Sequence, residues 1–159
     1  MVKIGIGQDS HKFESKLSKK PLILGGVLIP GSPGLSGNSD ADAILHALIN
    51  AISGVSCVNI LGKISDNLCL SNGITDSKVY LKEALETLKD FQISHISISV
   101  ECKKPKLEKF IEKIRTSLCK LLSVKPADIG ITATSGEGLT AFGRGEGIQV
   151  FVILTAEEK

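Results

Sequence analysis

Aromatic residues, closely spaced cysteines and long apolar runs are scarce in this sequence. Aromatics make up 4% of its 159 residues and tryptophan is absent, so we expect an aliphatic core. None of the four cysteines belongs to a C-x-x-C pair. This spacing excludes a zinc knuckle and a disulfide framework, and it favours reduced thiols in the cytoplasm. No apolar run reaches the ~18 residues that a membrane helix needs, so no membrane partner is expected.

Charge of one sign is also scarce, because 19 basic side chains are balanced by 17 acidic ones. A net charge of +2 argues against nucleic acid or a membrane surface as the main partner. A small anionic substrate in a local basic pocket remains possible. The length and the 42% apolar content suit one folded domain, residues 1–159. Because Met1 directly precedes an apolar strand pattern, we expect no signal peptide.

The apolar pattern switches between the periods of strands and helices. Strands are expected at residues 2–6, 96–102, 129–134 and 148–156, with two short strands that turn at Gly25 and Gly26. Helices are expected between an N-cap at Ser39 and a stop at Gly54, at 76–91 after a cap at Thr75, and at 107–122. Residues 57–73 and 135–147 are expected to be loops. The predicted fold class is α/β of the α+β type, with a mixed sheet and helices on one face.

Asp9 and His11 lie two residues apart at the end of the first predicted strand. In an extended chain both side chains leave on the same side, where a carboxylate and an imidazole form half of a zinc-type site. His46, on a polar face of the next predicted helix, would complete three ligands and leave the open position of a catalytic zinc. Asp42 could support His46, hold a substrate hydroxyl or cap the helix. The simpler alternative for Asp9 and His11 is a hydrogen-bonded turn.

A second candidate site lies in the glycine-rich segment 134–147. The hydroxyls of Thr134 and Ser135, free backbone N–H groups and Arg144 suit phosphate oxygens. Glu137 suits magnesium that is held jointly with substrate phosphates. The alternative is a hairpin loop with solvated charges. Lysines 103, 104 and 106 are either a solvated charge run or a contact to a nucleotide phosphate or base.

Three motifs together resemble one enzyme family. They are G-x-G-x-D-x-H-x-F at residues 5–13, S-D-x-D-x-x-x-H at 39–46 and G-R-G-E-G at 143–147. Over nearly its whole length the sequence is similar to the 2-C-methyl-D-erythritol 2,4-cyclodiphosphate synthase family of the non-mevalonate isoprenoid pathway. The resemblance implies a homotrimer with active sites between subunits and zinc on the aspartate and two histidines described above. It also implies magnesium or manganese on the substrate diphosphate near Glu137.

The resemblance further implies which residues contact the substrate. A cytidine pocket supplied by the neighbouring subunit is expected at residues 102–107 and 133–135. Ribose contacts are expected at 60–62, a flexible lid at 64–67, and a cavity on the threefold axis at Arg144. Asn38 and Ser135 are expected to act on the transferring phosphate. The full set of expected substrate contacts is Asp9, Ser10, His11, Asn38, Ser39, Asp42, Ile60, Leu61, Gly62, Asp66, Cys102, Lys106, Leu107, Ala133, Thr134, Ser135, Gly136, Glu137, Phe142 and Arg144.

The sequence departs from the family's usual pattern at several positions. Asn38 replaces a histidine, Ile60 an acid and Ser135 a threonine. The lid is shortened to Ile64-Ser65-Asp66, and a phenylalanine is shifted to Phe142. An amide at position 38 can still donate to a phosphate oxygen but carries no positive charge. These departures bear on ligand contacts more than on the reaction.

The implied reaction is an intramolecular phosphoryl transfer. The 2-phosphate of 4-diphosphocytidyl-2-C-methyl-D-erythritol 2-phosphate attacks the β-phosphorus, and CMP leaves as the cyclic diphosphate forms. The attacking group is already an anion, which agrees with the lack of a Ser/His/Asp or Cys/His arrangement in the sequence. Two alternatives stay open: a zinc hydrolase with water at the open zinc position, and a trimeric phosphate- or metal-binding protein without turnover.

Overall fold

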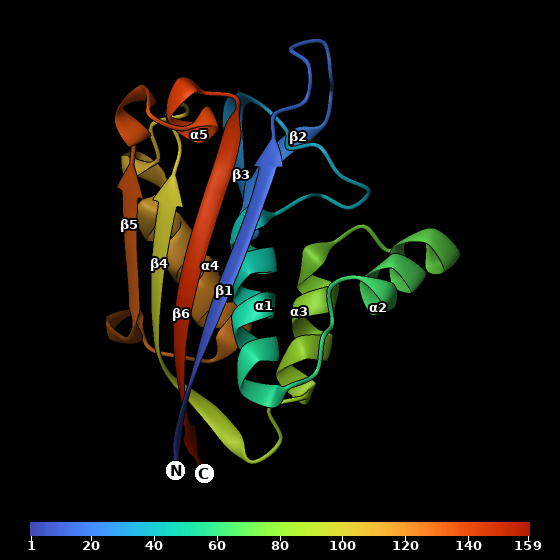
Figure 1. Ribbon diagram of the computed structural model, residues 1–159, viewed down its shortest axis with the longest axis vertical. Coiled ribbons are helices and arrows are strands. Elements are labelled where there is room, and N and C mark those ends of the chain that lie inside the picture. The colour runs from blue at the N-terminus through green and yellow to red at the C-terminus, as the bar shows by residue number, and fades with distance from the viewer.

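A four-stranded sheet forms the centre of the computed structural model, which describes residues 1–159 apart from the side chain of Lys63. The strands, in spatial order, are β1 (Val2–Lys12), β6 (Gly147–Glu158), β4 (Phe91–Glu101) and β5 (Ile129–Thr134). β6 pairs antiparallel with both of its neighbours, whereas β4 and β5 are parallel, so the predicted mixed sheet is confirmed. Both termini lie at the same end of the sheet (Figure 1).

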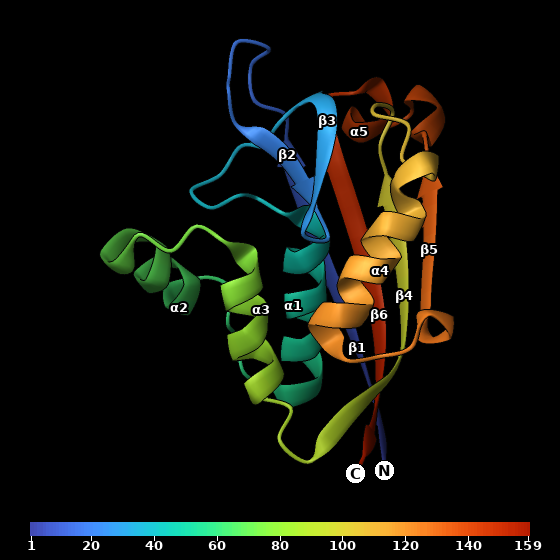
Figure 2. The same cartoon turned by 180° about the vertical axis from the view of Figure 1, so that it is seen from behind.

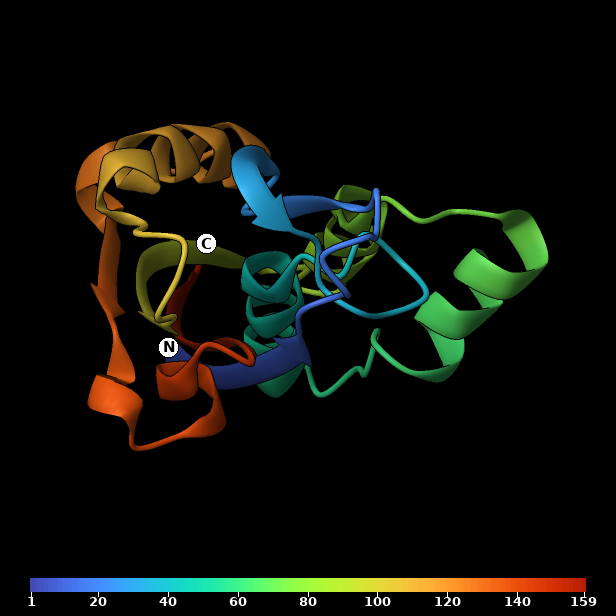
Figure 3. The same cartoon turned by 90° about the horizontal axis from the view of Figure 1, so that it is seen from above.

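The main helices all lie on one side of this sheet, as predicted (Figures 1 and 2). They are α1 (Ala43–Ser56), α3 (Ser77–Glu86) and α4 (Ile111–Leu122). A separate hairpin of β2 (Pro21–Leu24) and β3 (Val27–Pro33) lies on the same side. α2 (Lys63–Asp66) and the π-helical turn Asn67–Ser71 project away from the sheet (Figure 3). Among the described helices, none is both long and apolar enough to cross a membrane.

Two glycines let α1 lie directly on β1. A Cβ atom at Gly5 would come within 2.0 Å of the Ala51 carbonyl oxygen, and one at Gly7 within 1.8 Å of the Ala47 carbonyl oxygen. Any side chain at either position would therefore push the helix off the strand. Around this contact the buried core is almost wholly aliphatic, with Tyr80 and Phe110 as its aromatic members, which confirms the prediction from composition.

Several element bounds differ from the sequence prediction. β1 continues past the apolar run to Lys12, and β4 begins at Phe91 because α3 ends at Glu86 rather than at 91. Between α3 and β4, Lys89 adopts a positive φ of 48° in the turn that connects the two elements. The prediction of a loop at 57–73 was wrong for residues 63–71, which form the short helical turns named above. Turns this short contain no full apolar period.

The N-terminus of α1 is capped by Asp42. The sequence prediction of Ser39 as the cap was wrong. Asp42 is fully buried. Its Oδ1 accepts hydrogen bonds from the backbone N–H of Leu45 at 3.0 Å and Gly25 at 2.8 Å, and its Oδ2 accepts one from Gly26 at 2.7 Å. Burial raises the pKa of Asp42 to about 6, against the opposing effect of these three bonds. The carboxylate thus links the β2–β3 turn to the start of α1.

In α3 the N-cap is Asp76, one residue after the predicted Thr75.

We predict that Asp42→Ala lowers the free energy of unfolding by about 3 kcal/mol or more. It removes a helix cap, which is worth about 1 kcal/mol, and leaves the N–H groups of Gly25 and Gly26 without a partner, at about 1–3 kcal/mol each. Urea unfolding measures the loss. The control is Asp76→Ala, which removes only one exposed cap bond to Lys78 N. Equal losses in the two variants would contradict the role of Asp42.

Candidate metal centre and flanking cavities

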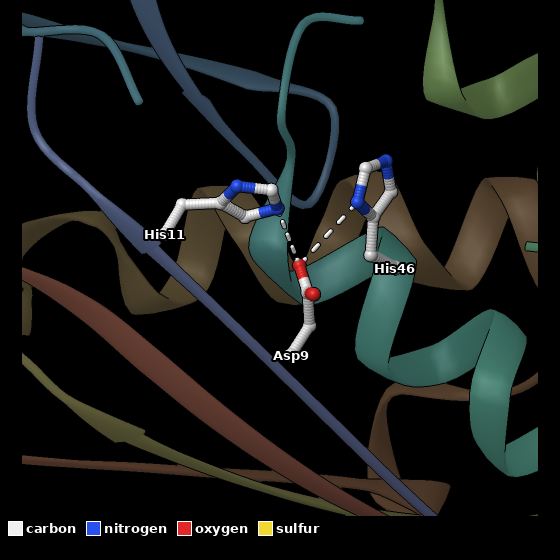
Figure 4. A group of neighbouring side chains, drawn as sticks. All are labelled: Asp9, His11 and His46. Atoms are coloured by element: carbon white, nitrogen blue, oxygen red, sulfur yellow. Dashed lines mark ion pairs between the residues drawn. The ribbon is translucent and has the colours of Figure 1, made fainter. Parts of the chain in front are cut away.

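The aspartate and two histidines singled out in the sequence converge on one point (Figure 4). Asp9 and His11 leave β1 on the same side, and His46 reaches them from α1. Asp9 Oδ2 lies 2.8 Å from His11 Nε2 and 3.3 Å from His46 Nδ1. One ligand atom from each of the three residues lies within 4.8 Å of the others, which is close enough for all three to hold a single metal ion.

Two polar atoms at the centre of this cluster are buried without a hydrogen-bond partner in the described part of the chain. Asp9 Oδ2 and His11 Nε2 are buried, and neither is in hydrogen-bonding geometry with a partner among the described residues. His11 Nδ1 lies 2.8 Å from the Ser36 carbonyl oxygen, which can only accept, so this nitrogen carries the proton. In the neutral ring Nε2 then presents a lone pair toward Asp9. Two facing lone pairs at 2.8 Å repel each other unless a cation lies between them, so the donor set fits a divalent metal.

The charges of the cluster also favour metal binding. Burial raises the pKa of Asp9, but the neighbouring His11 and His46 imidazoles more than offset this effect and lower it to about 2. The contact with Asp9 raises the pKa of His11, against the effect of burial. Asp9 is therefore ionised at neutral pH, and a bound metal would compete with a proton for His11 Nε2.

A cavity of about 400 Å³ opens beside the cluster. We call it the metal cavity. Seven of the residues expected to contact substrate line it: Asp9, His11, Asn38, Ser39, Leu61, Gly62 and Asp66. Ser65, from the expected lid, also lines it, as do four residues that were not expected there: Gly37, Asn50, Cys69 and Tyr80. Cys69 and Tyr80 come from segments that reach the cavity only through tertiary packing, so the local sequence pattern carried no signal for them.

Three residues expected to contact substrate lie elsewhere in the fold. Asp42 is buried in its capping role and does not line the metal cavity, so it neither supports His46 nor reaches a substrate hydroxyl. The side chain of Ile60 is buried in the core. Ser10 is exposed on the opposite side of β1 from Asp9 and His11, because side chains alternate along a strand. The carboxylate that does act on His46 is Asp40, through Ser77.

A second cavity, of about 530 Å³, lies where the parallel strands β4 and β5 end. Of the expected contacts it is lined by Cys102, Lys106, Leu107, Ala133, Thr134 and Ser135, together with Glu108 and Ile111. This β4–β5 cavity combines apolar walls with hydroxyls and one lysine. Burial raises the pKa of the Cys102 thiol to about 11, so it is a neutral part of the wall.

The glycine-rich segment forms a smaller pocket next to the β4–β5 cavity. Lys103, Lys106, Ser135 and Glu137 line this pocket of about 330 Å³. Glu137 adopts a positive φ of 51°, a strained conformation for a residue other than glycine, and its carboxylate accepts a hydrogen bond from Ser135 Oγ at 3.3 Å.

The other expected members of this segment have structural partners. Gly136 has a positive φ of 72°, and a Cβ atom there would lie 2.9 Å from the Gly143 Cα atom, so the position favours glycine. Phe142 and Arg144 belong to α5 (Ala141–Arg144), and Arg144 pairs with Glu146 at 2.8 Å.

Several known proteins are similar to this chain in sequence and in fold. The family model of the YgbB family matches residues 2–157. A curated relative from Chlamydia caviae, named 2-C-methyl-D-erythritol 2,4-cyclodiphosphate synthase, is 49% identical over 157 residues, which are 98% of this chain and 89% of the relative. A solved structure of the bifunctional IspDF from Campylobacter jejuni gives a TM-score of 0.90 at 28% identity, covering 100% of this chain and 43% of that chain. A CDP complex of IspF from Plasmodium falciparum gives 0.83 at 25% identity, covering 99% and 97%.

We predict that His46→Ala loses most of its bound zinc while it stays folded, because it removes one of three ligands from a site at the edge of the core. Elemental analysis after gel filtration measures the metal. The matched control is His95→Ala, which removes an exposed histidine from β4. Full zinc occupancy in His46→Ala would show that the cluster is not the metal site.

Proposed function

This chain belongs to the YgbB family, and from that premise we propose how its residues carry out the reaction for which its relatives are named. The enzyme converts 4-diphosphocytidyl-2-C-methyl-D-erythritol 2-phosphate to 2-C-methyl-D-erythritol 2,4-cyclodiphosphate and CMP, as a phosphorus–oxygen lyase of isoprenoid precursor synthesis. The observation that carries the proposal is the convergence of Asp9, His11 and His46 beside a cavity that also holds Asn38 and Ser39.

The proposed cofactors are zinc on this cluster and magnesium or manganese near Glu137. One carboxylate and two imidazoles are a typical zinc donor set, whereas a single carboxylate next to phosphates suits the harder cations. Metals bound there would neutralise negative charge on the transferring phosphate. A cytoplasmic location remains a prediction, and the four free cysteines agree with it.

In the proposed reaction the protein bends the substrate so that its two ends meet. An oxygen of the 2-phosphate forms a bond to the β-phosphorus, and the bond from that phosphorus to the α-phosphate oxygen breaks. CMP leaves with the electron pair. No side chain needs to remove a proton, because the nucleophile is already an anion. Asn38 and Ser39 are proposed to donate to phosphate oxygens in the metal cavity, and Ser135 to do so beside Glu137.

The β4–β5 cavity is the proposed site of the cytidine group. Leu107 and Ile111 offer apolar contacts for a base, and Thr134 and Ser135 offer hydroxyls. Lys106 lines both this cavity and the pocket of Glu137, so it can reach a phosphate between them. The CDP bound in the Plasmodium falciparum relative supports a nucleotide ligand for this fold.

The separation of the two cavities within one chain supports a trimer with active sites shared between subunits. The cluster belongs to β1 and α1, at one edge of the sheet, whereas the β4–β5 cavity lies at the other edge. Among the described residues none lines both cavities. A substrate that joins a metal-bound phosphate to a cytidine therefore needs a second copy of the chain. The sheet face without helices offers the contact surface, since Val2, Ile4, Ile6, Phe151 and Ile153 are 45–68% exposed on it.

We predict that the parent chain is a trimer and that Ile153→Glu separates it into inactive monomers, because the new carboxylate would be buried in the contact surface. Light scattering gives the mass. The control is Leu28→Glu, which alters an exposed apolar residue on the hairpin (60% exposed, against 49% for Ile153) and should leave the trimer intact. A parent chain that is active as a monomer would contradict the proposal.

We predict that Glu137→Gln keeps its zinc and its assembly but loses most of its magnesium-dependent rate. The amide preserves the size of the side chain and one acceptor oxygen, and it removes the charge that attracts the cation. Glu83→Gln, an exposed carboxylate on α3, is the control. A magnesium titration of Glu137→Gln that matches the parent would mean that Glu137 is only a solvated loop residue.

Incubation with the cytidine substrate, followed by phosphorus NMR, tests the reaction as a whole. The expected products are CMP and the cyclic diphosphate in equal amounts. Hydrolysis products, or binding without turnover, would contradict the proposed reaction and favour a zinc hydrolase or a binding protein respectively.

A further inference from the structure

At Nε2, the ring nitrogen of His46 that does not face Asp9, a short chain of hydrogen bonds leads to a second carboxylate. His46 Nε2 lies 2.8 Å from Ser77 Oγ, and Ser77 Oγ donates to Asp40 Oδ1. The backbone N–H of Ser77 donates to Asp40 Oδ2 at 3.1 Å. Ser77 is fully buried, so water does not compete for its hydroxyl. The direction of each hydrogen bond is therefore set by the three residues themselves.

The number of protons that the three side chains can donate decides which of them donates in each hydrogen bond. An ionised carboxylate can only accept, so the single proton of the Ser77 hydroxyl is given to Asp40. The oxygen of Ser77 then has only lone pairs to offer, and His46 Nε2 must donate to it. In a neutral imidazole one nitrogen carries the proton and the other a lone pair. The lone pair of His46 is consequently on Nδ1, the atom that lies 3.3 Å from Asp9 Oδ2.

We propose that Asp40 and Ser77 are positioning residues that hold His46 in its Nε2–H form, and that they thereby set the metal affinity of the cluster. This inference rests on the proposed metal function of the cluster. Hydrogen bonds to the second nitrogen of a ligand histidine orient the ring and typically change metal affinity about 10–100-fold. His11 needs no such side chains, because the Ser36 carbonyl oxygen fixes its proton.

A weaker partner limits the expected effect. Ser39 Oγ lies 3.5 Å from His46 Nε2 and accepts a hydrogen bond from the Ala41 N–H at 3.1 Å. Without the Ser77 hydroxyl, His46 Nε2 can still approach Ser39, but at a distance that orients the ring poorly. Removing Ser77 Oγ should therefore weaken the site rather than abolish it.

The first test compares the zinc affinity of Ser77→Ala with that of the parent by competition with a chelator. The variant keeps the backbone bond from residue 77 to Asp40, and alanine is a better helix former than serine, so the start of α3 should persist. The expected loss is about 10–100-fold. The matched control is Ser53→Ala, a buried serine on the same helix as His46 whose hydroxyl has no partner among the described residues. It should bind zinc like the parent.

Two outcomes of this comparison would overturn the role of Ser77, and a third would overturn the metal site. Equal zinc affinity in Ser77→Ala and the parent would overturn the role of Ser77. An equal loss in Ser53→Ala would overturn it too, because the effect would then be one of general stability. A parent chain that binds no zinc would overturn the metal site itself, and the inference with it.

The second test needs no variant. Nitrogen-15 NMR of the zinc-loaded parent identifies which nitrogen of the His46 ring carries the proton. We expect the proton on Nε2, protected from exchange with water, and the metal on Nδ1. A proton on Nδ1, or an Nε2 proton that exchanges as fast as one on an exposed histidine, would overturn the proposal.

Discussion

The close contact between α1 and β1 determines the geometry of the functional centre. At Gly5 and Gly7 the strand has no side chains, and the carbonyl oxygens of Ala51 and Ala47 occupy the space where Cβ atoms would lie. This approach brings His46, on the helix, within 3.3 Å of Asp9, on the strand. Side chains at these two positions would push the helix away from the strand, and His46 would then lie farther from Asp9. The glycines thus set the distance on which the cluster depends.

The sheet distributes the remaining chemistry between its two edges. The metal cavity belongs to the edge formed by β1, and the β4–β5 cavity to the edge where two parallel strands end. In the proposed function the first cavity takes a metal and phosphates, and the second takes a base. The apolar face between the two edges is exposed in a single chain. Assembly through that face would bury it and join the edges of neighbouring subunits.

Much of this centre could be predicted from local patterns, and the rest depends on contacts between distant segments. The two-residue spacing of Asp9 and His11 in a strand was sufficient to place them on one side. The role of Gly5 and Gly7 could not be predicted from the local pattern, because it depends on the helix that packs against them. The spacing of one helical turn suggested Asp42 as the support of His46, but Asp42 is buried as the helix cap and Asp40 is the partner of Ser77. Ser77 itself is 31 residues from His46, beyond any local pattern.

The most direct test of the account is anomalous diffraction at the zinc edge from crystals of the zinc-loaded protein. We expect one strong peak per chain, within bonding distance of Asp9 Oδ2, His11 Nε2 and His46 Nδ1. The third atom matters most, since it also reports on the orientation of the His46 ring. A peak that lies outside the cluster, or a ring that binds through Nε2, would contradict the account.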